Sequence, residues 1–228
     1  MVNLSLPSLN EQAEFNESVI AQTKENTTSD VKFMLAKRLF DIVISSIVIL
    51  LLLSWFIPII GILIRLTSPG PILFVQLRTG YNGRPFRCFK FRTMTYDRNA
   101  EFRQATQNDC RVTAIGRFLR KTNLDELPQV LNVFLGEMSI VGPRPHPVQL
   151  DAQYWRTMPG YPARYLVKPG ITGLAQVSGS RGETETLLKM KQRVRFDHFY
   201  IYKSSFLFDL RICWLTAVNM VRGDKNAC

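Results

Sequence analysis

The sequence predicts a membrane-associated α+β protein in which a hydrophobic N-terminal helix is joined to a body of short strands and helices. Three observations support this class. Residues 42–64 contain no ionisable side chain. Segments 72–78 and 86–92 flank an Asn-Gly pair at 82–83 that is typical of a tight β-turn. Ten of the twelve prolines lie between residues 69 and 169, which favours short elements joined by rigid turns.

The composition excludes a disordered chain and indicates an anionic partner. Hydrophobic residues make up 46% of the 228 residues, which is enough for a core. The formal net charge is +11, and it is unevenly spread: residues 1–41 hold four basic and six acidic side chains, so the remainder carries +13. Such a body attracts nucleic acid, an anionic lipid surface or phosphorylated substrates, and charge alone does not choose among them.

The first 30 residues are polar and acidic, and we expect residues 1–32 to form a mobile tail. A cleaved signal peptide is not expected, because the apolar run starts only near residue 40, behind this acidic leader. The four cysteines show no CxxC spacing, which favours reduced thiols over a disulfide framework or a thiolate zinc site. The only two histidines are far apart in sequence, which weighs against a multi-histidine metal site.

A helix is predicted over residues 33–66, and its topology has two interpretations. The 23 uncharged residues would span about 35 Å at 1.5 Å per residue, enough to cross the hydrocarbon core. The first interpretation is therefore a spanning anchor. Pro58, one turn after Ser54, would bend the helix, which supports the second: a broken, re-entrant helix. Basic residues flank the run on both sides, so the positive-inside rule gives no direction.

Residues 67–223 form the predicted globular domain. Two strands at 72–78 and 86–92 begin it as a small hairpin. The last segment, 204–223, has apolar residues at helical spacing, so it is either a core-facing helix or one lying in the membrane interface. Trp214 with the flanking Lys203 and Arg222 favours the interfacial interpretation. The other predicted elements are helices near 95–105, 114–121, 125–135 and 184–200 and a short strand at 171–177.

The densest chemical signal is the adjacent pair Asp125 and Glu126. Thr122 is expected to cap a helix that carries both carboxylates in its first turn. Helix N-termini favour negative charge, so the simplest interpretation of the pair is a good helix cap.

The cations near this pair favour a catalytic interpretation instead. Arg117, Arg120 and Lys121 precede the pair, and Arg144 follows between two prolines that fix its backbone. A guanidinium held in this way suits a phosphate group. Adjacent carboxylates among clustered cations predict a Mg²⁺-assisted attack on a phosphorylated substrate, with one carboxylate as nucleophile and the other as metal ligand or base.

Three segments resemble the bacterial sugar transferase family, the monotopic phosphoglycosyl transferases. They are KFRTM (90–94), TNLDELPQVLNVFLGEMSIVGPRP (122–145) and KPGITGLAQVSG (168–179). Three multi-residue matches in order over one chain are a specific signal. The similarity runs from about residue 37 to 221. It implies transfer of a sugar-1-phosphate from a UDP-sugar to undecaprenyl phosphate, with release of UMP.

The resemblance implies roles for individual residues. Asp125 would attack the sugar-bearing phosphorus, expel UMP and form an aspartyl-phosphosugar that undecaprenyl phosphate then attacks. Glu126 would act as base or support the metal, with Mg²⁺ held by Asp125 and Glu126. The predicted phosphate-binding cations are Lys90, Arg92, Arg120 and Arg144. The alternative roles are strand-surface charges for Lys90 and Arg92 and fixing the turn for Arg144.

The resemblance also addresses the sugar and the membrane helix. His146 and residues 180–187 are similar to the branch that transfers glucose-1-phosphate. Within them Arg181 and Glu183 would bind sugar hydroxyls, or else form a salt-bridged helix start. Family members carry a Ser-Pro pair that breaks the hydrophobic helix into a re-entrant shape. This chain departs from that pattern, because Ser54 is separated from Pro58 by three residues.

Taken with the resemblance, the expected location is the bacterial inner membrane, with the globular domain facing the cytoplasm. The expected role is the first membrane step of exopolysaccharide, capsule or O-antigen assembly. The expected partners are a UDP-sugar, undecaprenyl phosphate and inner-membrane lipid, without nucleic acid; homo-oligomerisation stays open. Two other classes are a membrane-anchored nucleic-acid-binding module, for which no recognisable motif is present, and a non-catalytic membrane scaffold.

Overall fold

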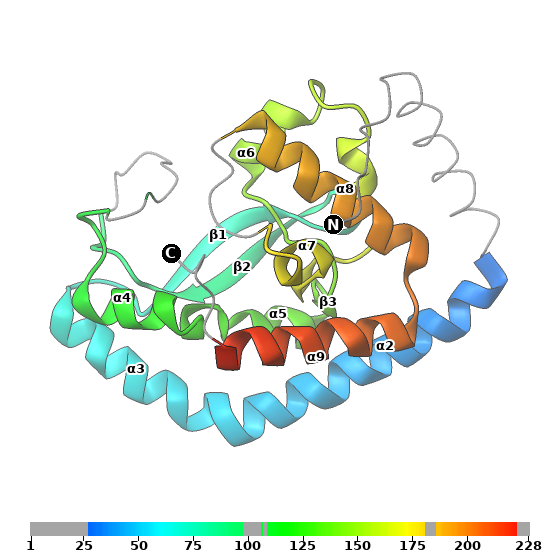
Figure 1. Cartoon of the computed structure of the whole chain (residues 1–228). Coiled ribbons are helices and arrows are strands. Elements are labelled where there is room, and N and C mark those ends of the chain that lie inside the picture. The colour runs from blue at the N-terminus through cyan, green and yellow to red at the C-terminus, as the bar shows by residue number, and fades with distance from the viewer. Residues whose placement is uncertain (1–26, 98–105, 107–108, 181–185, 223–228) are drawn as a thin grey trace.

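The computed structural model of the chain describes residues 27–97, 106, 109–180 and 186–222. Within them one long, bent helix supports a body of short strands and helices, which confirms the predicted α+β class (Figure 1). The body lies on the concave side of the bend in this view.

The long helix consists of α2 (Thr27–Val48), a π-helical turn η1 (Ile49–Leu53) and α3 (Ser54–Thr67). Pro58 lies inside α3, where it lacks an N–H and its ring crowds the carbonyl of Ser54. The hydroxyl of Ser54 donates to the carbonyl of Leu50 at 2.8 Å. A π-turn and a proline are both known causes of helix bending, and the bend in Figure 1 lies near η1. The helix is therefore bent without being interrupted, and the π-helical turn directly precedes Ser54.

Residues Val31–Thr67 are long and apolar enough to cross a membrane by length and composition. Large side chains such as those of Leu50, Leu51 and Leu66 are more than two-thirds exposed. Leu53, Ile60 and Ile64 point the other way and are buried. The helix thus has one face for the body and one apolar face that protein atoms leave uncovered, which makes membrane association plausible.

The N-terminal part of this helix is fixed to the body by a buried ion pair. Lys37 donates to the carboxylate of Asp209 at 2.5 Å and to the carbonyl of Val141 at 2.8 Å. Tyr200 donates to the other oxygen of Asp209 at 2.7 Å. Lys37, one of the basic residues that precede the apolar run, is therefore paired within the protein.

A second attachment, one turn further along, uses the carboxylate of Asp41. It accepts from the backbone N–H of Ile140 at 2.9 Å and from the hydroxyl of Ser139 at 3.1 Å. Arg38 donates to the carbonyls of Val133 and Phe134, which end a short helix of the body.

The predicted hairpin is confirmed as the antiparallel pair β1 (Leu73–Thr79) and β2 (Pro85–Phe91). Asn82 adopts a left-handed conformation at the turn, with φ 54°. Helix α5 (Gln129–Leu135) is joined to this hairpin by the amide of Asn132, which accepts from the N–H of Phe89 and donates to the carbonyl of Arg87. The side chain thus extends the backbone pairing of β2.

A second small sheet pairs β3 (Ser139–Val141) with β4 (Gly170–Thr172) in parallel. Strand β3 is not predicted by the sequence. The strand predicted at 171–177 is wrong beyond Thr172, because the chain turns there into α7 (Leu174–Val177). Gly142 and Gly170 allow the two strands to approach closely: a Cβ on Gly170 would lie 2.1 Å from the nitrogen of Gly142.

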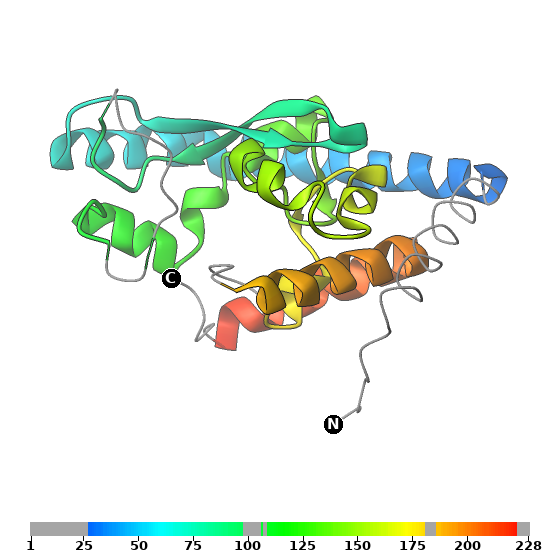
Figure 2. The ribbon, with the colours of Figure 1, turned by 90° about the horizontal axis from the view of Figure 1, so that it is seen from above.

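The remaining helices cover these sheets. The helices predicted at 114–121, 184–200 and 204–223 correspond to α4, α8 and α9, whereas most of the one near 95–105 lies outside the described residues. Figure 2 shows α8 and α9 on the side of the body away from the hairpin. Their bounds, with two further elements, are α4 (Ala114–Lys121), α6 (Val148–Tyr154), η4 (Tyr161–Leu166), α8 (Leu187–Lys203) and α9 (Phe206–Arg222).

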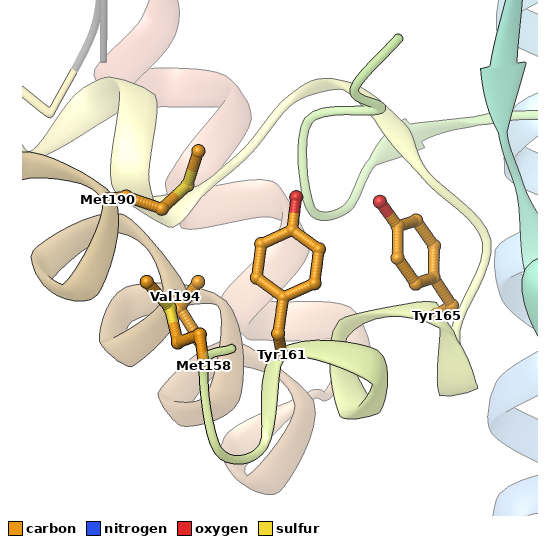
Figure 3. Packing of buried hydrophobic residues seen from close by; sticks show 5 residues of the cluster. All are labelled: Met158, Tyr161, Tyr165, Met190 and Val194. Carbon is orange, nitrogen blue, oxygen red and sulfur yellow. The ribbon is translucent and has the colours of Figure 1, made fainter. Parts of the chain in front are cut away.

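Several small apolar clusters make up the core. One joins α3 to β2 and α4 through Ile60, Ile64, Phe91 and Leu119. Another lies between η4 and α8, where the rings of Tyr161 and Tyr165 pack beside methionine and valine side chains (Figure 3). The two tyrosine hydroxyls point the same way, out of the apolar cluster.

Helix α9 satisfies both interpretations of its sequence in part. Ile212 is fully buried against the body. Leu207 and Trp214 are 79% and 69% exposed, so the opposite face stays apolar and uncovered.

We predict that Asp41→Ala lowers the free energy of unfolding by about 1–3 kcal/mol, because the buried N–H of Ile140 loses its acceptor. Thermal or denaturant unfolding in detergent micelles measures this loss. Val43→Ala, at an exposed position of the same helix, is the control and should change stability far less. Equal stability of the two variants would contradict the attachment role of Asp41.

Candidate active site

The two predicted catalytic carboxylates lie on a tight turn between α4 and α5. Asn123 is left-handed, with φ 58°, and the next three residues form a 3₁₀ turn, Leu124–Glu126. The helix predicted over 125–135 is therefore split, because α5 begins only after Pro128. Thr122 does not cap this segment as predicted. It ends α4, and its hydroxyl donates back to the carbonyl of Phe118 at 2.9 Å.

Glu126 is held by two cations from different parts of the chain. Arg144 donates through both terminal nitrogens of its guanidinium, one to each carboxylate oxygen. Lys90, on β2, donates to Oε1 at 2.7 Å. Only 12% of the Glu126 side chain is exposed. Burial raises the carboxyl pKa, but the charges and hydrogen bonds of Arg144 and Lys90 outweigh it and hold the pKa of Glu126 well below its usual range.

Asp125 has a different environment although it is the adjacent residue. In the part of the chain that the structure describes, no hydrogen bond reaches its carboxylate, and the residue is partly exposed. Burial raises the pKa of Asp125 and the charge of Glu126 adds to this, while Lys90 opposes it. The turn therefore presents one carboxylate locked in ion pairs and one that is free to react.

Burial disfavours the positive charge of Lys90, and the negative charge of Glu126 offsets this effect. Burial lowers the pKa of Lys90, and the charge of Glu126 acts in the opposite direction. Among the predicted phosphate-binding residues, Lys90 and Arg144 are the two that the structure brings onto the carboxylate pair.

The other predicted site residues lie elsewhere or outside the described chain. Arg92 donates to the carbonyls of Ser68 and Pro69, so it holds the end of α3. Arg120 donates through Nε to the hydroxyl of Thr93 at 2.9 Å, and its charge reaches Asp125. Arg181 and Glu183, the predicted sugar-binding residues, are not among the described residues.

Two residues near the site were not predicted in their observed roles. Arg78 is buried at the end of β1. Burial lowers its pKa, and both carboxylates lie near enough for their negative charge to oppose this. The only sequence signal for it is an arginine on an apolar strand. His146 is buried, and burial together with the charge of Arg164 holds its pKa well below the usual value.

The sequence matches the model of a known protein family over most of its length. Residues 32–223 match the family described as bacterial sugar transferase. The chain belongs to the bacterial sugar transferase family. This confirms the resemblance seen in the sequence, and the match includes the long helix, the carboxylate turn and α9.

Three relatives illustrate the similarity. The UDP-glucose:undecaprenyl-phosphate glucose-1-phosphate transferase of Klebsiella pneumoniae is 51% identical over 80% of this chain and 39% of the relative. The protein of the same description from Xanthomonas campestris pv. campestris is 45% identical over 96% of this chain and 46% of the relative. The exopolysaccharide production protein PSS of Rhizobium leguminosarum bv. phaseoli is 43% identical over 85% of this chain and 98% of the relative. The chain thus spans less than half the length of the first two relatives and nearly all of the third.

We predict that Arg144→Met lowers the free energy of unfolding at pH 7 by about 2–4 kcal/mol, because Glu126 loses a partner while remaining largely buried. A carboxyl with a depressed folded-state pKa stabilises the fold above its unfolded pKa, and this contribution is lost as the pH falls through the folded-state value. The gap between wild type and variant should therefore narrow below about pH 4.3, the pKa of an ordinary glutamate. Unfolding curves at several pH values measure the gap, and a gap independent of pH would contradict the assignment.

Proposed function

We propose that the chain transfers a sugar-1-phosphate, with glucose-1-phosphate favoured, from a UDP-sugar to undecaprenyl phosphate and releases UMP. The observation that carries this proposal is the asymmetry of the carboxylate pair: Asp125 is unpaired beside a Glu126 that is held by Lys90 and Arg144. The names of the Klebsiella and Xanthomonas relatives support the substrates, and that of the Rhizobium relative supports a role in exopolysaccharide production.

The free carboxylate suits a two-step transfer. An oxygen of Asp125 attacks the phosphorus that carries the sugar, and the bond from this phosphorus to the bridging oxygen breaks, so that UMP leaves with that oxygen. A phosphate oxygen of undecaprenyl phosphate then attacks the same phosphorus, which releases Asp125 and forms the diphosphate-linked lipid. Two bulky anions thereby use one site in turn.

The cations on Glu126 supply the charge that the phosphates need. Lys90 and Arg144 are already desolvated and oriented before substrate arrives, so little reorganisation is needed when negative charge develops on the transferred group. Until substrate binds, Glu126 keeps both cations in place and partly neutralises their positive charge. Arg120 is near enough to add a third positive charge, whereas phosphate contacts by Arg92, Arg181 and Glu183 stay predictions.

Mg²⁺ is the proposed metal, and Asp125 is the side chain through which the site could bind it. Mg²⁺ is commonly held by one or two carboxylates together with substrate phosphates and water. Both oxygens of Glu126 accept hydrogen bonds from Lys90 or Arg144, so Asp125 is the carboxylate open to a cation. When bound, the metal would neutralise phosphate charge; Asp125 would hold it together with the UDP-sugar, whereas a metal contact by Glu126 stays a prediction.

The bent helix is proposed to re-enter the membrane surface rather than to cross it. Its N-terminal part is attached through Lys37 and Asp41, and its C-terminal end through Arg92. Because the same body holds both ends, they lie on one side of a bilayer, and the bend near η1 is its deepest point. The location proposed is the bacterial inner membrane, with the body on the cytoplasmic side.

We predict that Asp125→Asn lowers UMP release by about three orders of magnitude or more, because the amide is no longer a nucleophile. The assay incubates membranes with undecaprenyl phosphate, Mg²⁺ and a panel of UDP-sugars, with and without EDTA. The donor that supports release identifies the sugar, and loss of release in EDTA supports the metal.

The same assay discriminates the alternative functions. A scaffold would keep its behaviour in Asp125→Asn and release no UMP with any donor. A nucleic-acid-binding module would also release none and would bind random DNA with a steep salt dependence. Full UMP release by Asp125→Asn would contradict the role of Asp125 as nucleophile, but the chain would still act as a transferase.

We predict that single cysteines at Lys32→Cys and Pro71→Cys, in a background without the native cysteines, react with an impermeant maleimide from the cytoplasmic side. Both positions are exposed; Lys32 lies near the N-terminal end of the bent helix, and Pro71 follows its C-terminal end. Labelling intact and inverted vesicles measures the side. Reaction of the two cysteines from opposite sides would establish a spanning helix and contradict re-entry.

A further inference from the structure

The loop that carries Arg144 is held by its backbone carbonyls. Three of its residues are prolines, which have no N–H to donate. Each of the four successive carbonyls from Pro143 to His146 nevertheless accepts a hydrogen bond. The donors are, in order, the N–H of Gly170 at 2.9 Å, Nη2 of Arg164 at 2.8 Å, Nη1 of Arg78 at 2.8 Å and the N–H of Thr79 at 3.1 Å.

Two of these donors are backbone groups and two are buried guanidinium groups. The backbone groups of Gly170 and Thr79 belong to the ends of β4 and β1. The guanidinium groups of Arg164 and Arg78 act on the two central carbonyls, those of Arg144 and Pro145. Arginine is a costly residue to bury for a structural hydrogen bond that a neutral side chain could make.

The guanidinium of Arg164 is fixed on every side. It is 1% exposed and pairs with Asp197 of α8, through Nε at 3.1 Å and Nη2 at 2.8 Å. The rings of Tyr161 and Tyr165, seen in Figure 3, lie 5.2 and 5.5 Å from its central carbon. Its Nη1 contacts the ring nitrogen Nδ1 of His146. Nη2 is thus aimed at the carbonyl of Arg144 by contacts from two helical segments.

Arg78 acts from the opposite side of the loop. It is 8% exposed at the end of β1, and Nη2 donates to the side chain of Gln76 at 3.2 Å while Nη1 donates to Pro145. The loop is therefore held between a strand residue and a residue of η4.

We infer that Arg164 and Arg78 are positioning residues for the transfer reaction, which hold the backbone of Arg144 so that its guanidinium meets Glu126 on both oxygens. The inference rests on the proposed function. Neither residue touches the carboxylate pair through a hydrogen bond in the described structure. They act through Arg144, and Asp197 extends the chain of contacts to α8.

The geometry requires an arginine at position 164. A lysine keeps the charge, but its single nitrogen lacks the planar fork that reaches Asp197, His146 and the carbonyl of Arg144 together. Displacement of Arg144 by a fraction of an ångström would leave Glu126 with Lys90 as its main partner. The guanidinium would then no longer be aligned with both carboxylate oxygens, and the positive charge placed for the transferred phosphate would shift with it.

The test compares Arg164→Lys with wild type and with Arg156→Lys, an exposed arginine of the same region, as matched control. UMP release is measured as kcat and KM for the active UDP-sugar between pH 5 and 9. We expect kcat to fall about 10- to 100-fold with KM changed less than about threefold. The control should match wild type in both constants.

A merely structural role gives a different result. Partial unfolding would lower kcat in proportion to the loss of folded protein, which circular dichroism measures, whereas misplacement of Arg144 lowers kcat per folded molecule. A fall in kcat that only matches the lost folded fraction, or an unchanged kcat in folded protein, overturns the inference. Asp197→Asn is the second variant and decides the matter where Arg164→Lys does not fold. It should lower kcat per folded molecule about three- to tenfold. Absence of UMP release in wild type would instead remove the proposed function, and this inference with it.

Discussion

The organisation of the candidate site depends on the pairing of Glu126 with Lys90 and Arg144. These residues come from a 3₁₀ turn, a strand and a proline-bounded loop that are separated by up to 54 positions in the sequence. Each charge alone would be costly to desolvate, so any one of them is stable in place only when the other two are present. The ion-pair cluster therefore fixes the relative positions of the hairpin, the carboxylate turn and the Arg144 loop.

The same logic explains how the bent helix relates to the site. Lys37 and Asp41 attach its N-terminal part to β3, from which the chain runs directly into the Arg144 loop. Arg92 attaches its other end to the strand that carries Lys90. The segment proposed to lie in lipid is thus connected to both cations on Glu126. A site that accepts a substrate from a bilayer needs a fixed height above that bilayer, and these attachments provide it.

The sequence predicts the parts of this structure that have a local cause. Two strand-like segments around an Asn-Gly turn suffice for the hairpin, and an apolar run with Pro58 suffices for a bent helix. Short elements such as β3 escape prediction because three residues carry no period. The strand predicted at 171–177 overlaps both β4 and α7, because the two together form one apolar stretch. Motif resemblance identified Asp125 and Glu126. It did not predict that Arg92 would hold a helix end, or that Arg78 and Arg164 would contact the loop, because those contacts depend on tertiary packing.

The difference between the two adjacent carboxylates follows from the turn that carries them. Successive residues of a 3₁₀ turn project about 120° apart, since the turn has three residues per revolution. Glu126 can therefore face the buried cations while the side chain of Asp125 leaves the turn in another direction and stays partly exposed. A continuous helix beginning at Thr122 would place the two carboxylates differently. Left-handed Asn123 before the turn and Pro128 after it keep the segment from joining either neighbouring helix. The two breaks in helical structure are thus what separates a carboxylate that organises charge from one that is available as a nucleophile.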